Sequence, residues 1–161
     1  MRKLKKIIAT VLAATMMMAM GVTAFAANGA TTLTNATFVR DTGKALPLGM
    51  GTGVIAENGA TMDADGNITV QLQSYSRWLF VTYTGTITDA YYIDSEGNVS
   101  GDNLIDSDGN LEIPADYAME AMPNNGNGIH LQLTFEMKPS TPPGMNTTMN
   151  AYFTCDNFQQ N

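Results

Sequence analysis

Two methionines stand four residues apart near the C-terminal end of the chain, Met145 and Met149 in the stretch TPPGMNTTMNAY. Turn-forming residues precede them and a strand-like segment follows. A thioether sulfur is a soft ligand that suits Cu(I) and the iron of haem. Positions i and i+4 of an extended strand point to the same side, so we expect the two side chains beside one another. The pair therefore predicts either a soft-metal ligand or two core side chains.

Catalytic side chains are scarce in this sequence. His130 is the single histidine, Cys155 is the single cysteine, and there is no Ser-x-x-Lys, Gly-x-Ser-x-Gly or Cys-x-x-Cys motif. His130 falls at a polar position of an alternating strand, where we expect an ordinary exposed side chain. Cys155 is interpreted as a small buried residue of the last strand, with an intermolecular disulfide as the alternative. The sequence predicts a protein that is not an enzyme.

Three short acidic runs have the composition of tight turns, in which aspartate or asparagine bonds its own backbone and glycine takes a positive φ. An EF-hand calcium loop would need a glutamate at its twelfth position, and none of the three runs has one. We therefore interpret them as hairpin turns rather than calcium sites. The runs are DADGN (63–67), DSEGN (94–98) and DSDGN (106–110), and their twelfth positions hold Ser74, Ile105 and Tyr117.

Strand-like alternation dominates the rest of the chain. In GIHLQLTFEMK every second residue from Ile129 to Met137 is apolar, which is typical of a half-buried β-strand. The same pattern in 67–73 and the β-branched and aromatic residues of 77–94 predict further strands. Short helical turns are expected only in 47–53 and 113–122. The pattern predicts an all-β fold, an immunoglobulin-like antiparallel β-sandwich of about seven or eight strands.

The first 26 residues have the pattern of a secretory signal peptide, with a basic head, an apolar run and the small-residue ending Ala24-Phe25-Ala26. Cleavage there would leave residues 27–161 as a single secreted domain without a membrane span. That domain would have four basic residues against 15 acidic ones, a net charge of −11, compared with −7 for the whole chain. Such a surface disfavours nucleic acid and anionic membranes as partners.

The stretch from Ile129 to Phe158 resembles the last hairpin of the NEAT (near-iron-transporter) domains, haem-binding immunoglobulin-like modules that Gram-positive bacteria use in iron acquisition. In that family a strand leads through a short proline-containing turn to a Tyr-x-x-x-Tyr motif, whose first tyrosine binds the iron. The matching stretch here, PPGMNTTMNAYFTCDNF, has Met145 in place of the first tyrosine and Met149 in place of the second. Thioethers would therefore replace the phenolate ligand.

An upstream stretch is similar to the segment of the same family that covers the ligand. The sequence ALPLGMGTGVIAENGATMDADGNITVQLQ (45–73) has Met50 in the expected short helical turn. Trp78 follows about where the family often has an aromatic residue. For Met50, an ordinary glycine-rich loop is the alternative.

The resemblance implies a secreted haemophore or haem relay that holds a non-covalent b-type haem. Met145 below and Met50 above would ligate the iron, while Met149 and Tyr152 would pack against the porphyrin. Core packing is the alternative for each of these side chains. The haem would pass to other haem carriers or to a cell-surface receptor, and its propionates would meet one of four side chains, Arg77, Lys44, Thr147 or Thr148.

A second hypothesis keeps the fold and changes the function. A secreted β-sandwich adhesion or carbohydrate-binding module would use exposed aromatic side chains as a stacking platform. The candidates for that platform are Trp78, Tyr75, Tyr91 and Tyr92. The haem hypothesis requires the sulfur of Met145 to adjoin an apolar slot rather than to lie deep between the sheets.

Overall fold

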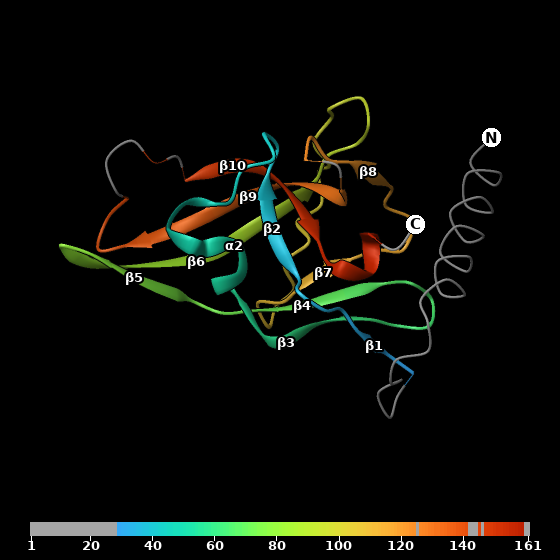
Figure 1. Cartoon of the computed structure of the whole chain (residues 1–161), viewed down its shortest axis with the longest axis horizontal. Coiled ribbons are helices and arrows are strands. Elements are labelled where there is room, and N and C mark those ends of the chain that lie inside the picture. The colour runs from blue at the N-terminus through green and yellow to red at the C-terminus, as the bar shows by residue number, and fades with distance from the viewer. Residues whose placement is uncertain (1–28, 125, 142–144, 146, 160–161) are drawn as a thin grey trace.

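A computed structural model describes residues 29–124, 126–141, 145 and 147–159, so the predicted signal peptide (1–26) lies outside the described residues. The chain forms two antiparallel sheets that share one apolar core (Figure 1). The helical segments in the described ranges are only three or four residues long, and none of them is long and apolar enough to cross a membrane. The predicted all-β architecture is confirmed at this level.

The smaller sheet has four strands in the order β1-β3-β4-β7. Its centre is the hairpin of β3 and β4, which the DADGN run connects, and β7 pairs with the free side of β4. The strands are β1 (Thr31–Thr32), β3 (Ile55–Met62), β4 (Ile68–Leu72) and β7 (Leu111–Ile113).

The larger sheet has six strands, five of them in the order β2-β10-β9-β6-β5, while β8 pairs with one end of β9. The twelve-residue strands β6 and β9 pair along most of their length and form the middle of the sheet. The strands are β2 (Thr37–Arg40), β5 (Tyr75–Leu79), β6 (Val81–Tyr92), β8 (Met119–Ala121), β9 (Asn127–Lys138) and β10 (Thr148–Thr154).

The helical segments agree with the prediction in one place and differ in another. A 3-10 turn, η1 (Pro47–Gly49), and the single-turn helix α2 (Met50–Gly53) join β2 to β3, where a helical turn was expected. The helical turn expected in 113–122 is wrong, because the chain enters β8 there and pairs with β9. Pairing with an existing strand outweighs a weak local helical pattern. The described chain also has η2 (Asp156–Gln159) after β10, and ten strands rather than seven or eight.

The alternation predicted for 129–137 is confirmed in β9. Its apolar positions all point into the core, whereas the positions between them are half-buried or exposed. Phe38 of β2 and Phe153 of β10 add a tilted aromatic pair with ring centroids 5.6 Å apart. The buried side chains of β9 are Ile129, Leu131, Leu133, Phe135 and Met137.

The three acidic runs form the predicted hairpin turns and share one hydrogen-bond pattern. In each turn the first aspartate accepts the backbone N–H groups two and four residues later, at 2.8–2.9 Å. The side chain of Asn98 holds the pKa of Asp94 below its usual value, and the backbone N–H of Asn110 does the same for Asp106. Each carboxylate is therefore engaged by its own turn.

These lowered pKa values predict how the turns respond to acid. A carboxyl group whose folded pKa is depressed stabilises the fold above its unfolded pKa of about 3.9, and this contribution is lost as the pH falls through the folded pKa. We expect the double variant Asp94→Asn, Asp106→Asn to lose less thermal stability than the parent chain between about pH 5 and pH 2. Melting curves by circular dichroism measure this, and parallel pH profiles for the two chains would contradict it.

Candidate ligand-binding site

Helix α2 lies against β2 and over β6 (Figure 1). Its first residue, Met50, belongs to the buried core. Only 1% of Met50 is exposed. A Cβ atom at Gly85 of β6 would lie 2.8 Å from the sulfur of Met50 and 3.0 Å from the sulfur of Met137. Two thioethers, one from α2 and one from β9, therefore converge on a glycine of the larger sheet.

Three alternate glycines allow this short helix to approach its neighbours closely. A Cβ at Gly51 would lie 2.5 Å from the carbonyl oxygen of Phe38, and a Cβ at Gly53 would overlap the ring of Tyr75. A Cβ at Gly49, whose φ is +81°, would stand 3.2 Å from the hydroxyl of Tyr75. The G-x-G-x-G spacing of 49–53 is the sequence signal for this close packing.

Met149 lies on the core face of β10. It is paired with Leu133, a fully buried residue of β9, and opposed residues of an antiparallel pair point to the same side. Ala151, two residues further along the same face, is fully buried, whereas Met149 is only half-buried. Met145 precedes β10, is also half-buried and packs against the same core. The thioethers of Met145 and Met149 are therefore partly exposed at the edge of the core, where β9 is connected to β10.

Tyr152 and Trp78 do not join the three methionines. Tyr152 is paired with His130 on the outer face of the larger sheet, where the two rings stack with centroids 4.5 Å apart. Trp78 follows Tyr75 by three residues in β5, so it points to the face opposite Tyr75, and 68% of it is exposed. The candidates Met50, Met145 and Met149 therefore share the core, while Trp78 and Tyr152 lie on the other face of the sheet.

Two further side chains of the core face are Tyr75, which the sequence offered only as an aromatic candidate, and Tyr83, which was missed from the sequence. Tyr75 and Tyr83 are half-buried and pack against the same core as Met145. Tyr83 is paired with Arg77, which is exposed and lies on the same face. Their assignment to this face depends on the register of β5 and β6, which alternation alone does not fix.

Of the four side chains considered for a haem propionate, Arg77 is the one that the strand register places on the core face of the β5–β6 hairpin. The hydroxyl of Thr148 lies 3.3 Å from that of Thr134 on the outer face, and Thr147 and Lys44 are exposed in connecting segments.

The four aromatic residues considered for a carbohydrate platform do not share a face. Tyr75 packs on α2, and Tyr91 is paired with Gln132 on the outer face. Tyr92, next in the chain, stacks on Tyr117 with ring centroids 4.1 Å apart. Trp78 is separate from all of these at the end of β5. A flat stacking surface made of these four side chains is not formed.

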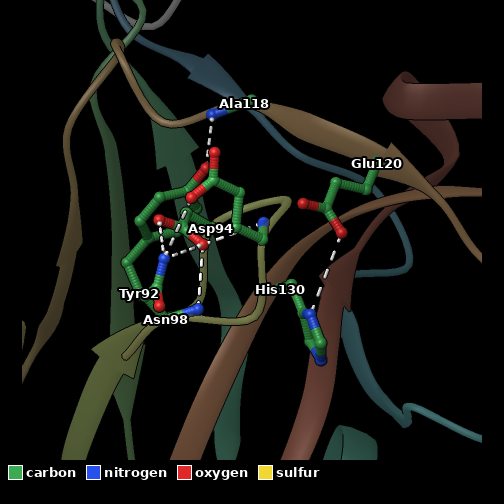
Figure 2. A network of polar contacts seen from close by, with 7 residues as sticks. Tyr92, Asp94, Asn98, Ala118, Glu120 and His130 are labelled. Atoms are coloured by element: carbon green, nitrogen blue, oxygen red, sulfur yellow. Dashed lines mark hydrogen bonds and ion pairs between the residues drawn. The ribbon is translucent and has the colours of Figure 1, made fainter. Parts of the chain in front are cut away.

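A polar group on the outer face includes His130, which is more covered than expected. Its Nδ1 lies 3.8 Å from a carboxylate oxygen of Glu120 (Figure 2). Within the described residues, Nε2 of His130 and the second carboxylate oxygen of Glu120 are buried without a hydrogen-bond partner. Burial, followed by the nearby Glu120 charge, raises the pKa of Tyr152. Among the described residues no three His, Cys, Asp or Glu side chains gather as a metal site.

Figure 2 also shows a hydrogen bond to the residue before β8. The hydroxyl of Tyr92 accepts the backbone N–H of Ala118 at 3.3 Å. Separately, the carboxylate of Asp94 accepts the backbone N–H of Asn98 within its own turn. Glu120 follows Ala118 by two residues, so the Tyr92 contact ties down the strand that carries the Glu120 carboxylate beside His130.

Cys155 is buried directly after β10, as the interpretation of a small core residue predicted. Burial raises the pKa of its thiol to about 12, so the thiol stays protonated at neutral pH. Because the thiolate is the reactive form, Cys155 is a poor nucleophile and a poor metal ligand in the folded chain.

No known protein family, curated protein or solved structure that was compared with the chain matches it. The site must therefore be interpreted from its own chemistry.

The packing of α2 predicts a large cost for a small substitution. We expect Gly51→Ala to lower the free energy of unfolding by about 1–3 kcal/mol, because the added methyl group meets the backbone of Phe38. Gly101→Ala is the matched control, since a Cβ there meets nothing within 4 Å. Urea denaturation of both variants measures the difference, and equal stabilities would show that α2 is not packed in this way.

The unequal burial of the methionines gives a second prediction. Met50→Ala should lower the free energy of unfolding by about 2–5 kcal/mol, the range for emptying a filled core site. Met145→Ala should cost clearly less, because its side chain is only half-buried. Denaturant unfolding of the two variants compares them directly. A larger loss of unfolding free energy for Met145→Ala than for Met50→Ala would show that Met145, and not Met50, is the more deeply buried methionine.

Proposed function

We propose that this chain is a secreted haem-binding protein, a haemophore or haem relay of immunoglobulin-like sandwich fold. The carrying observation is that Met145 and Met149 stay half-buried at the edge of an otherwise closed apolar core. Met145 would be the axial ligand from the hairpin side, with Met149 packed against the porphyrin. A partly covered thioether can be reached by a ligand, whereas the other core residues of β10 cannot.

The partly covered side chains of the core to which Met145 belongs suit a flat apolar ligand with anionic edges. Leu48, Tyr75 and Tyr83 are half-buried and pack against the same core, which supplies apolar surface for a porphyrin face. Burying a few hundred Å² of such surface contributes several kcal/mol at about 25 cal/mol per Å². Arg77, on the face of the ribbon that carries Tyr83, is a cation suited to a propionate.

Met50 has a different role in this proposal. Its sulfur is covered by α2 and rests on Gly85, so ligation by Met50 requires α2 to lift from the sheet. A single-turn helix has little internal stability, which makes such a movement inexpensive compared with opening the core. The backbone of Leu48, beside this helix, has a φ of +61°, a strained value for leucine that movement would release. Met50 would thus become available as a second thioether ligand only after α2 has moved away from the sheet.

A hemin titration of the purified chain tests the proposal. We expect a sharp Soret band distinct from that of free hemin. Met145→Ala should shift this band and weaken binding by about tenfold without abolishing it, because burial of the porphyrin remains favourable. Met145→Tyr should still bind and should lower the reduction potential, since a thioether favours ferrous iron more than a phenolate does.

Met119→Ala is the matched control for these variants. Met119 is half-buried on β8, and its partner Ile129 is at the opposite end of β9 from Met137. Its spectrum should equal that of the parent chain. Absorbance no different from free hemin for the parent, or equal effects of the Met119 and Met145 variants, would reject the proposal.

A further inference from the structure

The hairpin of β5 and β6 ends in four consecutive apolar residues that nothing in the described chain covers. Trp78 is 68% exposed and Phe80 is 94% exposed, and both Leu79 and Val81 are exposed as well. The two rings contact each other at 6.0 Å between centroids. In Figure 1 this ribbon projects beyond the rest of the larger sheet. We name residues 78–81 the apolar tip.

Side chains of the apolar tip point in several directions. Leu79 and Val81 are paired with each other on one face, Trp78 is on the opposite face, and Phe80 is at the apex. A strand surface that packs on a protein usually has one apolar and one polar face. A tip that is apolar all round fits a surrounding apolar medium better than one flat partner surface.

Phe80 has a strained backbone conformation, and its one aromatic contact in the described chain, with Trp78, leaves it 94% exposed. Its φ is +65°, in the left-handed region that favours glycine, and an aromatic residue there is strained. Strain of this kind persists where it serves a function. Because so much of the Phe80 side chain is exposed, a contact outside the described chain could add far more stabilisation than the Trp78 contact provides.

The segment that carries the apolar tip is poor in acidic residues, so it can approach the phosphate groups of a membrane with little repulsion. The chain has 15 acidic residues, yet none lies between Asp65 and Asp89, and Arg77 is the single charged residue of that interval. Behind the tip the outer face has hydroxyl pairs, Ser76 with Thr84 and Ser74 with Thr86, each at 2.7 Å. Beside these hydroxyls, β9 carries the exposed ion pair of Lys138 with Glu136 at 3.6 Å. The order from the apex is therefore apolar side chains, aromatic ring, arginine and hydroxyls, then paired charges, which matches the polarity gradient at the edge of a bilayer.

A second copy of the chain is a poorer partner. Among the described residues, Val99 is the one exposed large apolar side chain outside the apolar tip, and it is 45% exposed. Apart from the half-buried side chains at which haem binding is proposed, the described surface therefore has no second cluster of exposed apolar residues to receive the tip of another molecule.

We propose that the apolar tip inserts into the interface of a zwitterionic phospholipid membrane, with Arg77 at the phosphate level. The two tip residues on β5, Trp78 and Leu79, span about 7 Å at roughly 3.3 Å per residue. That length agrees with the depth of about 5–10 Å to which interfacial segments are buried. The acidic remainder of the molecule stays in water, so added anionic lipid weakens the binding. This inference is independent of haem.

Trp78 is the single tryptophan of the chain and lies in the tip, so its fluorescence reports insertion directly. The haem-free chain from Ala27 onward should be used, because the apolar leader could itself bind lipid and every described element lies after it. On addition of phosphatidylcholine vesicles we expect a blue shift of the emission and quenching by brominated acyl chains. Vesicles that also contain phosphatidylglycerol should give weaker binding.

Phe80→Gly is the decisive variant, since glycine accepts the positive φ and keeps Trp78 as the probe. It should reduce vesicle partitioning by about tenfold or more, the effect of removing one aromatic side chain from an apolar medium. Val99→Ser, at an exposed apolar residue outside the tip, should leave partitioning unchanged. Absence of a blue shift, equal partitioning of Phe80→Gly and the parent, or a shift that depends on protein concentration without vesicles would overturn the proposal.

Discussion

Strand β9 is the constraint on which the rest of the molecule depends. It pairs with β6 on one side and β10 on the other, and its alternating apolar residues fill the space between the sheets. Because side chains alternate along a strand, the register of these two pairings assigns every neighbouring residue to a face. Met149 is a core-side residue because it is opposite Leu133, and Tyr152 is an outer residue because it is opposite His130. The candidate site is thus a consequence of one register.

The same constraint explains what could be predicted from the sequence. The alternation in 129–137, the three acidic turns and the helical turn in 47–53 depend on local patterns, and each is present in the structure. The outward orientation of Tyr152 and Trp78 depends on pairing between distant segments, which a single sequence does not reveal. The segment 113–122 fails for the same reason, because its conformation is decided by contact with β9.

Helix α2 packs closely on the larger sheet because glycines, which have no side chain, occupy the contact positions. Glycines at 51, 53 and 85 leave room for a carbonyl group, a tyrosine ring and two sulfur atoms. A flexible thioether fills an irregular space well, so methionine suits the space between α2 and the glycine of β6. Glycine spacing in 49–53 could have indicated this arrangement in advance, whereas the role of Gly85 depends on the pairing of β6 with β9.

The acidic turns have a consequence for the chemical lifetime of the chain. Asp-Gly sequences age by attack of the glycine nitrogen on the preceding side chain, which produces isoaspartate. In two of the turns that nitrogen is engaged: the N–H of Gly66 donates to the carbonyl of Asp63 at 3.2 Å, and that of Gly109 donates to Asp106 at 3.1 Å. Because a hydrogen-bonded N–H is less available for attack, we expect both linkages, Asp65-Gly66 and Asp108-Gly109, to form isoaspartate more slowly in the folded hairpins than in an unfolded chain.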